Sequence, residues 1–125
     1  YMESGVVRER PISGDFVEGH DLVARLHDAM RRFVGPGTTF HCLHEFANDV
    51  IREAGFENLD FMGNVGHSIC TRLENRVYIE SGNNISLGDV AAFTFEPHVR
   101  KSGGRWGFKR EDIYSFDDFG KLVEI

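Results

Sequence analysis

The sequence of residues 22–55, LVARLHDAMRRFVGPGTTFHCLHEFANDVIREAG, decides the fold class. In its first part apolar residues recur every three or four positions, which is the period of a helix with one buried face. These positions are Leu22, Val23, Leu26, Ala29, Met30 and Phe33. We expect the helix to open at Asp15 or Glu18 and to end at Val34-Gly35-Pro36-Gly37, where glycine and proline cannot continue it.

A second helix is predicted directly after this turn, with Thr38 or Thr39 as its N-cap. Gly55 ends the helical pattern. Its apolar face comprises Phe40, Leu43, Phe46, Ala47, Val50, Ile51 and Ala54. Two amphipathic helices are therefore expected back to back across a tight Pro-Gly turn.

Beyond Gly55 the pattern changes to short, β-like segments. Residues 90–95 form the continuous apolar run VAAFTF, which is typical of a strand buried on both faces. Residues 106–116 indicate one long strand with charges embedded in it. The other expected pieces are an irregular strand within residues 61–69, a short strand at Val77 and Ile79, and a final segment at residues 122–125. Two helices followed by several strands indicate an α+β domain.

Composition is that of an ordinary globular domain. The chain has 125 residues, of which 41% are hydrophobic and 27% charged, and its length fits one domain. A formal net charge of −6 argues against nucleic acid or an anionic membrane as a partner, and no apolar run is long enough for a membrane span. Cys42 and Cys70 are too few for a disulfide framework, so we expect two buried free thiols and a cytoplasmic protein.

Three ionisable residues stand where apolar strands would bury their neighbours, namely His67, Glu96 and Glu111. Burying a carboxylate costs several kcal/mol unless it is paired or bound to a metal, so the three could converge on a divalent ion. Each has an ordinary alternative. A histidine such as His67, taken alone, is more often a hydrogen-bonded structural residue. Glu96 precedes a proline and could simply end a strand. Glu111 follows two basic residues and could be half of a surface ion pair.

The order of the motifs around these residues is more specific than any one of them. Gly66-His67-Ser68-Ile69, then Phe93-Thr94-Phe95-Glu96-Pro97, then Glu111-Asp112, together with the preceding helix pair, resemble the pita-bread metallopeptidases. This family includes methionine aminopeptidase, prolidase, Xaa-Pro aminopeptidase and creatinase. The resemblance covers roughly residues 15–125 and implies a partial pita-bread fold, with two helices packed on a curved, mainly antiparallel sheet.

The resemblance also implies a site and a reaction. His67, Glu96 and Glu111 would be metal ligands, with Glu111 bridging two divalent ions, and Glu96 and His67 would be the catalytic residues, Glu96 moving protons. One imidazole with carboxylates suits manganese, cobalt, iron or zinc and does not choose among them. The implied function is hydrolysis of a peptide substrate by a metal-activated water, as in an aminopeptidase or dipeptidase.

The family takes two further ligands from aspartates on strands before the helix pair, and this chain has no counterpart of them. We therefore expect residues 1–125 to be a single domain, the C-terminal portion of a pita-bread catalytic domain that lacks the Asp-bearing strands. Such a fragment would hold one ion or none and have little activity alone. Its exposed sheet edge would permit a homodimer or strand exchange.

Other departures concern the substrate pocket. Glu74 stands where many members have a substrate-contacting histidine, and we take it and Trp106 as candidate substrate-binding residues, although Trp106 is more readily a core anchor. His20, His27 and His98 have no evident partners in the sequence. The alternative function is a catalytically inactive pita-bread module that binds peptides or protein partners. A small α+β domain without metal chemistry would require the ordered motifs to be coincidence.

Overall fold

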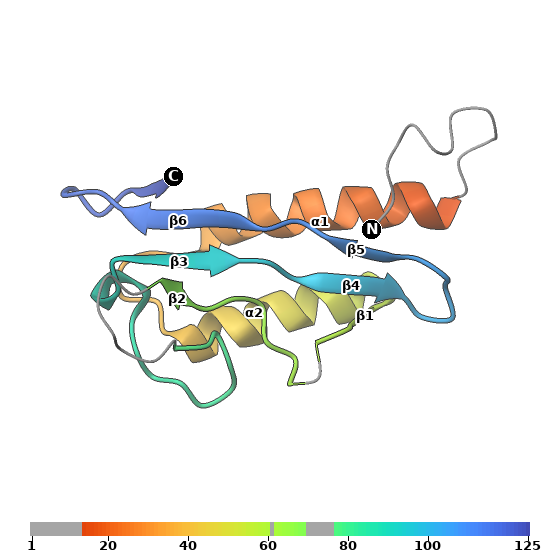
Figure 1. Ribbon diagram of the computed structural model, residues 1–125, viewed down its shortest axis with the longest axis horizontal. Helices are drawn as coiled ribbons and strands as arrows, with labels where there is room; N and C mark the ends of the chain where they lie inside the picture. The colour runs from red at the N-terminus through yellow and green to blue at the C-terminus, as the bar shows by residue number, and fades with distance from the viewer. Residues whose placement is uncertain (1–13, 61, 70–76) are drawn as a thin grey trace.

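The structure is a computed structural model that describes residues 14–60, 62–69 and 77–125. Two helices are followed by seven short strands among these residues, which confirms the α+β class. Figure 1 shows both helices behind the strands, with α1 running beside β5 and β6.

The helix α1 (Gly14–Phe33) forms as its apolar period predicts. Leu22, Leu26 and Met30 are buried on one face, and the solvent-facing side carries the charges of Arg31 and Arg32 in the last turn. The helix packs against both α2 and the strands β4 and β5, so it supplies one wall behind the sheets.

The helix α2 (Phe40–Glu53) begins at the predicted cap. The hydroxyl of Thr39 accepts the N–H of Cys42 at 3.1 Å, which satisfies one of the free donors at the helix start. Gly55 follows the helix with φ +79°, a left-handed conformation that favours glycine. Cys42 itself is exposed, so the expectation of a buried thiol is wrong there, because the residue lies on the face opposite the apolar stripe. Cys70 lies outside the described residues.

The strands form two antiparallel sheets. The first has the order β1-β4-β5, with β1 (Phe56–Asn58), β4 (His98–Lys101) and β5 (Gly107–Lys109). The second has the order β2-β3-β6-β7, with β2 (Ser68–Ile69), β3 (Ala92–Phe95), β6 (Asp112–Phe116) and β7 (Leu122–Glu124). A short 3₁₀ helix, η2 (Leu87–Asp89), precedes β3.

One predicted strand is wrong in its extent. Residues 106–116 do not form a single strand but break at Arg110 and Glu111 into β5 and β6, which belong to different sheets. The adjacent strand is interrupted opposite this break, at Glu96 and Pro97 between β3 and β4. Proline has no N–H for a sheet ladder, which accounts for a break at this point.

Smaller differences concern the short strands. The sequence did not predict β1 or β4, and the strand expected at Val77 and Ile79 is reduced to a bridge between His67 and Tyr78. Of the run 90–95 predicted to be buried on both faces, Ala92–Phe95 is confirmed as the buried strand β3, whereas Val90 is partly buried and Ala91 is exposed ahead of the strand. No helix in the described part of the chain is long and apolar enough to cross a membrane.

Candidate metal centre

The backbone of His67 is fixed by close contacts with the neighbouring strand β3. A Cβ atom at Gly66 would lie 2.0 Å from Thr94 O, so only glycine lets the segment before β2 approach the strand β3 this closely. Thr94 donates its N–H to His67 O at 2.8 Å, and the hydroxyl of Thr94 accepts the N–H of His67 at 3.1 Å. The backbone of His67 is therefore held from β3 at two points.

The ring of His67 presents a lone pair to its carboxylate neighbour. Nδ1 lies 2.8 Å from Ser68 O, and because a carbonyl can only accept, Nδ1 carries the hydrogen. Nε2 is then free to act as a ligand, and it lies 3.7 Å from Glu96 Oε2.

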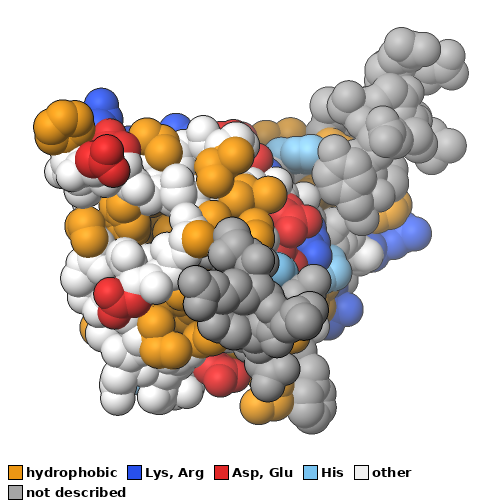
Figure 2. Space-filling model, turned by 60° about the vertical axis from the view of Figure 1, so that its left-hand side comes forward, with side chains coloured by type: hydrophobic (Ala, Val, Ile, Leu, Met, Phe, Trp, Pro, Cys, Tyr) orange, Lys and Arg blue, Asp and Glu red, His pale blue; other side chains and the backbone are white. Residues whose placement is uncertain are grey.

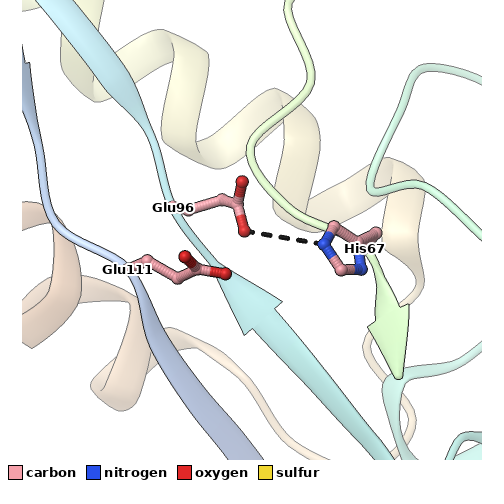
Figure 3. A group of neighbouring side chains, drawn as sticks. All are labelled: His67, Glu96 and Glu111. Atoms are coloured by element: carbon pink, nitrogen blue, oxygen red, sulfur yellow. Dashed lines mark ion pairs between the residues drawn. The ribbon is translucent and has the colours of Figure 1, made fainter. Parts of the chain in front are cut away.

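Glu96 and Glu111 face each other at the break between the two sheets. Phe95 pairs with Asp112 and His98 pairs with Lys109, so the same register places Glu96 opposite Glu111. One ligand atom from each of His67, Glu96 and Glu111 lies within 4.8 Å of the others. Figure 3 shows the three side chains converging from three separate segments. The structure thus brings together the three residues that the motifs predicted as ligands.

The pKa values of the two facing carboxyl groups are shifted in opposite directions. The pKa of Glu111 is raised above its ordinary value, first by hydrogen bonding with Glu96 and then by burial and by the charge of Glu96. Burial acts to raise the pKa of Glu96 as well, but hydrogen bonds with Glu111 and Thr94 and the nearby Lys109 outweigh it, and the net shift is downward. Lys109 Nζ lies 3.3 Å from Glu96 Oε1. Of the two carboxyl groups, Glu111 is therefore the one whose protonated form is favoured, and Glu96 the one whose ionised form is favoured.

This donor set fits a divalent ion. Glu96 Oε2 is buried and has no hydrogen-bond partner among the described residues, an arrangement that costs free energy unless a cation takes the partner's place. One imidazole nitrogen and carboxylate oxygens suit a borderline or hard divalent metal. Among the described residues this is the one cluster of three or more candidate ligands, and three ligand atoms suffice to hold one ion.

A cavity of about 250 Å³ adjoins the cluster. His67 and Glu96 line it together with Tyr78, His98 and Lys109. In Figure 2, histidine, acidic and basic side chains gather on one part of the surface, with hydrophobic side chains exposed around them. Two of the three candidate ligands, His67 and Glu96, therefore face an open cavity.

The two residues predicted to bind substrate have different outcomes. Trp106 is not among the described residues that line the cavity; it is partly buried, packs against the hydrophobic core and lies beneath the guanidinium of Arg105 at 5.4 Å. Glu74 lies outside the described residues. A role of either in substrate binding stays a prediction.

Two residues of the cavity wall and one buried histidine near it were not predicted. His98 and Lys109 pair across β4 and β5 and line the cavity, and the signal was their position two residues from Glu96 and Glu111. The expectation that His27 has no partner is wrong, because its ring nitrogens contact Tyr114 and Arg110. The signal was its place on the buried stripe of the first helix, four residues after Val23.

Comparison with known proteins agrees with the motifs. Residues 7–118 match the sequence profile of Metallopeptidase family M24. The chain is 32% identical over 108 residues to the probable dipeptidase PepE of Mycobacterium tuberculosis, a stretch that covers 86% of this chain and 28% of that protein.

Solved structures show the same fold. A dipeptidase from Pyrococcus horikoshii matches with a TM-score of 0.73 at 22% identity, covering 91% of this chain and 31% of that one. The dipeptidase PepE from Mycobacterium ulcerans matches with a TM-score of 0.68 at 28% identity, covering 91% of this chain and 30% of that one. The predicted partial pita-bread fold is confirmed. The chain spans less than a third of the length of each of these relatives.

Proposed function

The chain belongs to metallopeptidase family M24, and on that premise we propose that it carries one side of a metal-dependent peptidase site of the aminopeptidase or dipeptidase type. The observation that carries the proposal is the convergence of His67, Glu96 and Glu111, with ligand atoms within 4.8 Å of one another beside a cavity. The substrate class is a short peptide, because the similar proteins include dipeptidases and the cavity is small.

The three side chains would hold the ion with His67 Nε2, Glu96 Oε2 and a carboxylate oxygen of Glu111. When bound, a divalent ion polarises a peptide carbonyl and lowers the pKa of a water molecule, so that hydrolysis proceeds near neutral pH. Manganese, cobalt, iron and zinc all accept this donor set, and we propose manganese as the first to test.

The proposed proton-transfer residue is Glu96. With Oε2 used as a ligand, Oε1 would be the oxygen that accepts a proton from the attacking water and donates it to the departing amine. Lys109 Nζ, 3.3 Å from Oε1, favours the ionised form of this oxygen between turnovers. His67 is held as a ligand by the hydrogen bond from Nδ1 to Ser68 O.

We further propose that residues 1–125 are the C-terminal portion of a catalytic domain and that the chain alone is a weak enzyme. Three ligands supply less negative charge than the two ions of the complete site require. A second candidate function is a peptide-binding module without catalysis. The observation that favours it is Lys109, whose ammonium competes with a metal ion for Glu96.

Hydrolysis assays distinguish these functions. The chain would be freed of metal, reloaded with Mn²⁺ and incubated with a panel of dipeptides that includes Xaa-Pro sequences, with Glu96→Gln as the control. We expect slow, metal-dependent release of amino acids that Glu96→Gln abolishes. Peptide binding without hydrolysis would favour the binding module. If the chain bound neither metal nor peptide, both functions would be contradicted.

We also propose a cytoplasmic location. Cys42 is a free, exposed cysteine, which suits a reducing compartment better than an oxidising one. Fractionation of cells that produce the chain tests this, and recovery outside the cytoplasm would contradict it.

A further inference from the structure

His27 is a buried polar residue on the apolar face of α1. It is 1% exposed and belongs to neither the cavity wall nor the ligand cluster. Its ring contacts Phe95 edge-on, with a centroid separation of 4.9 Å, and both ring nitrogens have polar neighbours. A histidine in such a position costs free energy unless its hydrogen bonds are satisfied.

The two hydrogen bonds of His27 define its tautomer. Nε2 lies 2.7 Å from Arg110 O, and because a carbonyl only accepts, Nε2 carries the hydrogen and donates it. Nδ1 then accepts the hydroxyl hydrogen of Tyr114 at 2.7 Å. Burial lowers the pKa of His27, against the opposing influence of its hydrogen bond with the Arg110 carbonyl and, less strongly, of Asp112 at 3.5 Å, which agrees with a neutral ring.

The carbonyl of Arg110 needs this donor because the sheet cannot supply one. Successive residues of a strand direct their backbone N–H groups to opposite neighbours. Glu96 donates its N–H to Val65 O, away from Glu111, so the backbone of the next residue, Pro97, faces Arg110 in the strand register. Proline has no N–H. The Nε2–H of His27 therefore takes the place of the missing ladder hydrogen bond at the break between β5 and β6.

This contact lies one residue from a candidate ligand. Arg110 immediately precedes Glu111, and Phe95, which the ring of His27 also contacts, immediately precedes Glu96. Arg110 and Glu111 connect the two sheets and belong to no strand of either. Figure 1 shows α1 passing beside this break.

We propose that His27 is a positioning residue for the metal centre, whose Nε2–H holds the Arg110 carbonyl and thereby orients Glu111 toward His67 and Glu96. The inference rests on the proposed metal-binding function. It assigns a role in metal affinity to a residue that touches neither the ion nor the substrate. Outer residues of this kind typically change metal affinity by about 10-fold to 100-fold when replaced.

Two substitutions at the same position separate positioning from simple packing. The amide nitrogen of Gln reaches the place of Nε2, so His27→Gln keeps a donor for Arg110 O. The shorter side chain of His27→Asn reaches only the place of Nδ1, beside Tyr114. Tyr114→Phe removes the other hydrogen bond and leaves the Arg110 contact intact, so it controls for a general loss of core stability.

The assay is titration of the 125-residue chain with Co²⁺, whose visible absorption reports the ligand set, at a temperature where each variant is shown by circular dichroism to be folded. We expect His27→Asn to weaken Co²⁺ binding by about tenfold or more and to shift the spectrum toward that of Glu111→Ala. His27→Gln and Tyr114→Phe should keep the affinity and spectrum of the unaltered chain.

The contrary results are distinct. Equal Co²⁺ affinity in His27→Asn, His27→Gln and the unaltered chain would overturn the positioning role. A loss in Tyr114→Phe as large as that in His27→Asn would also overturn it, since core stability would then explain both. If the unaltered chain binds no Co²⁺, or Glu111→Ala binds it equally well, the metal centre itself fails, and the role of His27 with it.

Discussion

Gly66→Ala tests how the site depends on the close approach of two chain segments. The added Cβ would lie 2.0 Å from Thr94 O, whereas an ordinary contact is about 3.4 Å or longer, so the segments must separate by more than 1 Å. That movement strains three backbone hydrogen bonds: Thr94 N–H to His67 O at 2.8 Å, Ile79 N–H to Gly66 O at 2.8 Å, and Glu96 N–H to Val65 O at 2.7 Å. At about 1 kcal/mol for each, the free energy of unfolding should fall by about 3 kcal/mol.

Thermal unfolding followed by circular dichroism measures the loss, and a decrease in Tm of about 10 °C is expected for a domain of this size. Gly37→Ala is the matched control, because a Cβ there meets nothing within 4 Å and should leave Tm unchanged. Metal affinity should fall in Gly66→Ala only, since His67 moves with the segment. If Gly66→Ala had the same Tm and metal affinity as Gly37→Ala, the site would not depend on the close approach of Gly66 to Thr94.

Three further changes test the site and the core. Glu96→Gln keeps the shape of the side chain but removes its charge, so metal affinity should fall by at least about tenfold in calorimetric titration; an unchanged affinity would exclude Glu96 as a ligand. The pKa of Glu111 is raised, first by its hydrogen bond with Glu96, so a proton competes with the metal ion for this carboxylate at mildly acidic pH. Metal affinity should therefore rise with pH until Glu111 is ionised. Calorimetry in two buffers of different ionisation enthalpy should detect the released proton, and a pH-independent affinity without proton release would contradict this. Leu43→Ala removes a fully buried side chain from α2 and should cost about 2–5 kcal/mol in urea unfolding; a loss below about 1 kcal/mol would show that the apolar face of α2 is not packed as described.

The helices were predictable because one local period determines them. The apolar residues of α1 and α2 repeat with the spacing that buries one face, and Thr39 and Gly55 mark the ends of α2 by their own side-chain and backbone chemistry. The strands were less predictable because their limits depend on the neighbouring strand. The segment around Glu111 has nothing in its own sequence that ends a strand, and the break follows from Pro97 on the opposite strand.

The candidate ligands were predictable from ordered motifs, but their support was not. His67, Glu96 and Glu111 come together as the resemblance implied. The contact of His27 with Arg110 joins residues 83 positions apart, and no local pattern reports such a pairing. The ion pair of Lys109 with Glu96 likewise depends on strand register, which cannot be predicted from the local sequence.

The proposed metal centre requires that His67, Glu96 and Glu111 together bind a divalent ion. The most direct measurement is the number of metal ions bound per chain, from elemental analysis and calorimetric titration with Mn²⁺, Co²⁺ and Zn²⁺, in the unaltered chain and in Glu111→Ala. We expect one ion per chain, as the three described ligands allow, and a loss of that ion in Glu111→Ala. Absence of binding, or binding that Glu111→Ala leaves unchanged, would contradict it.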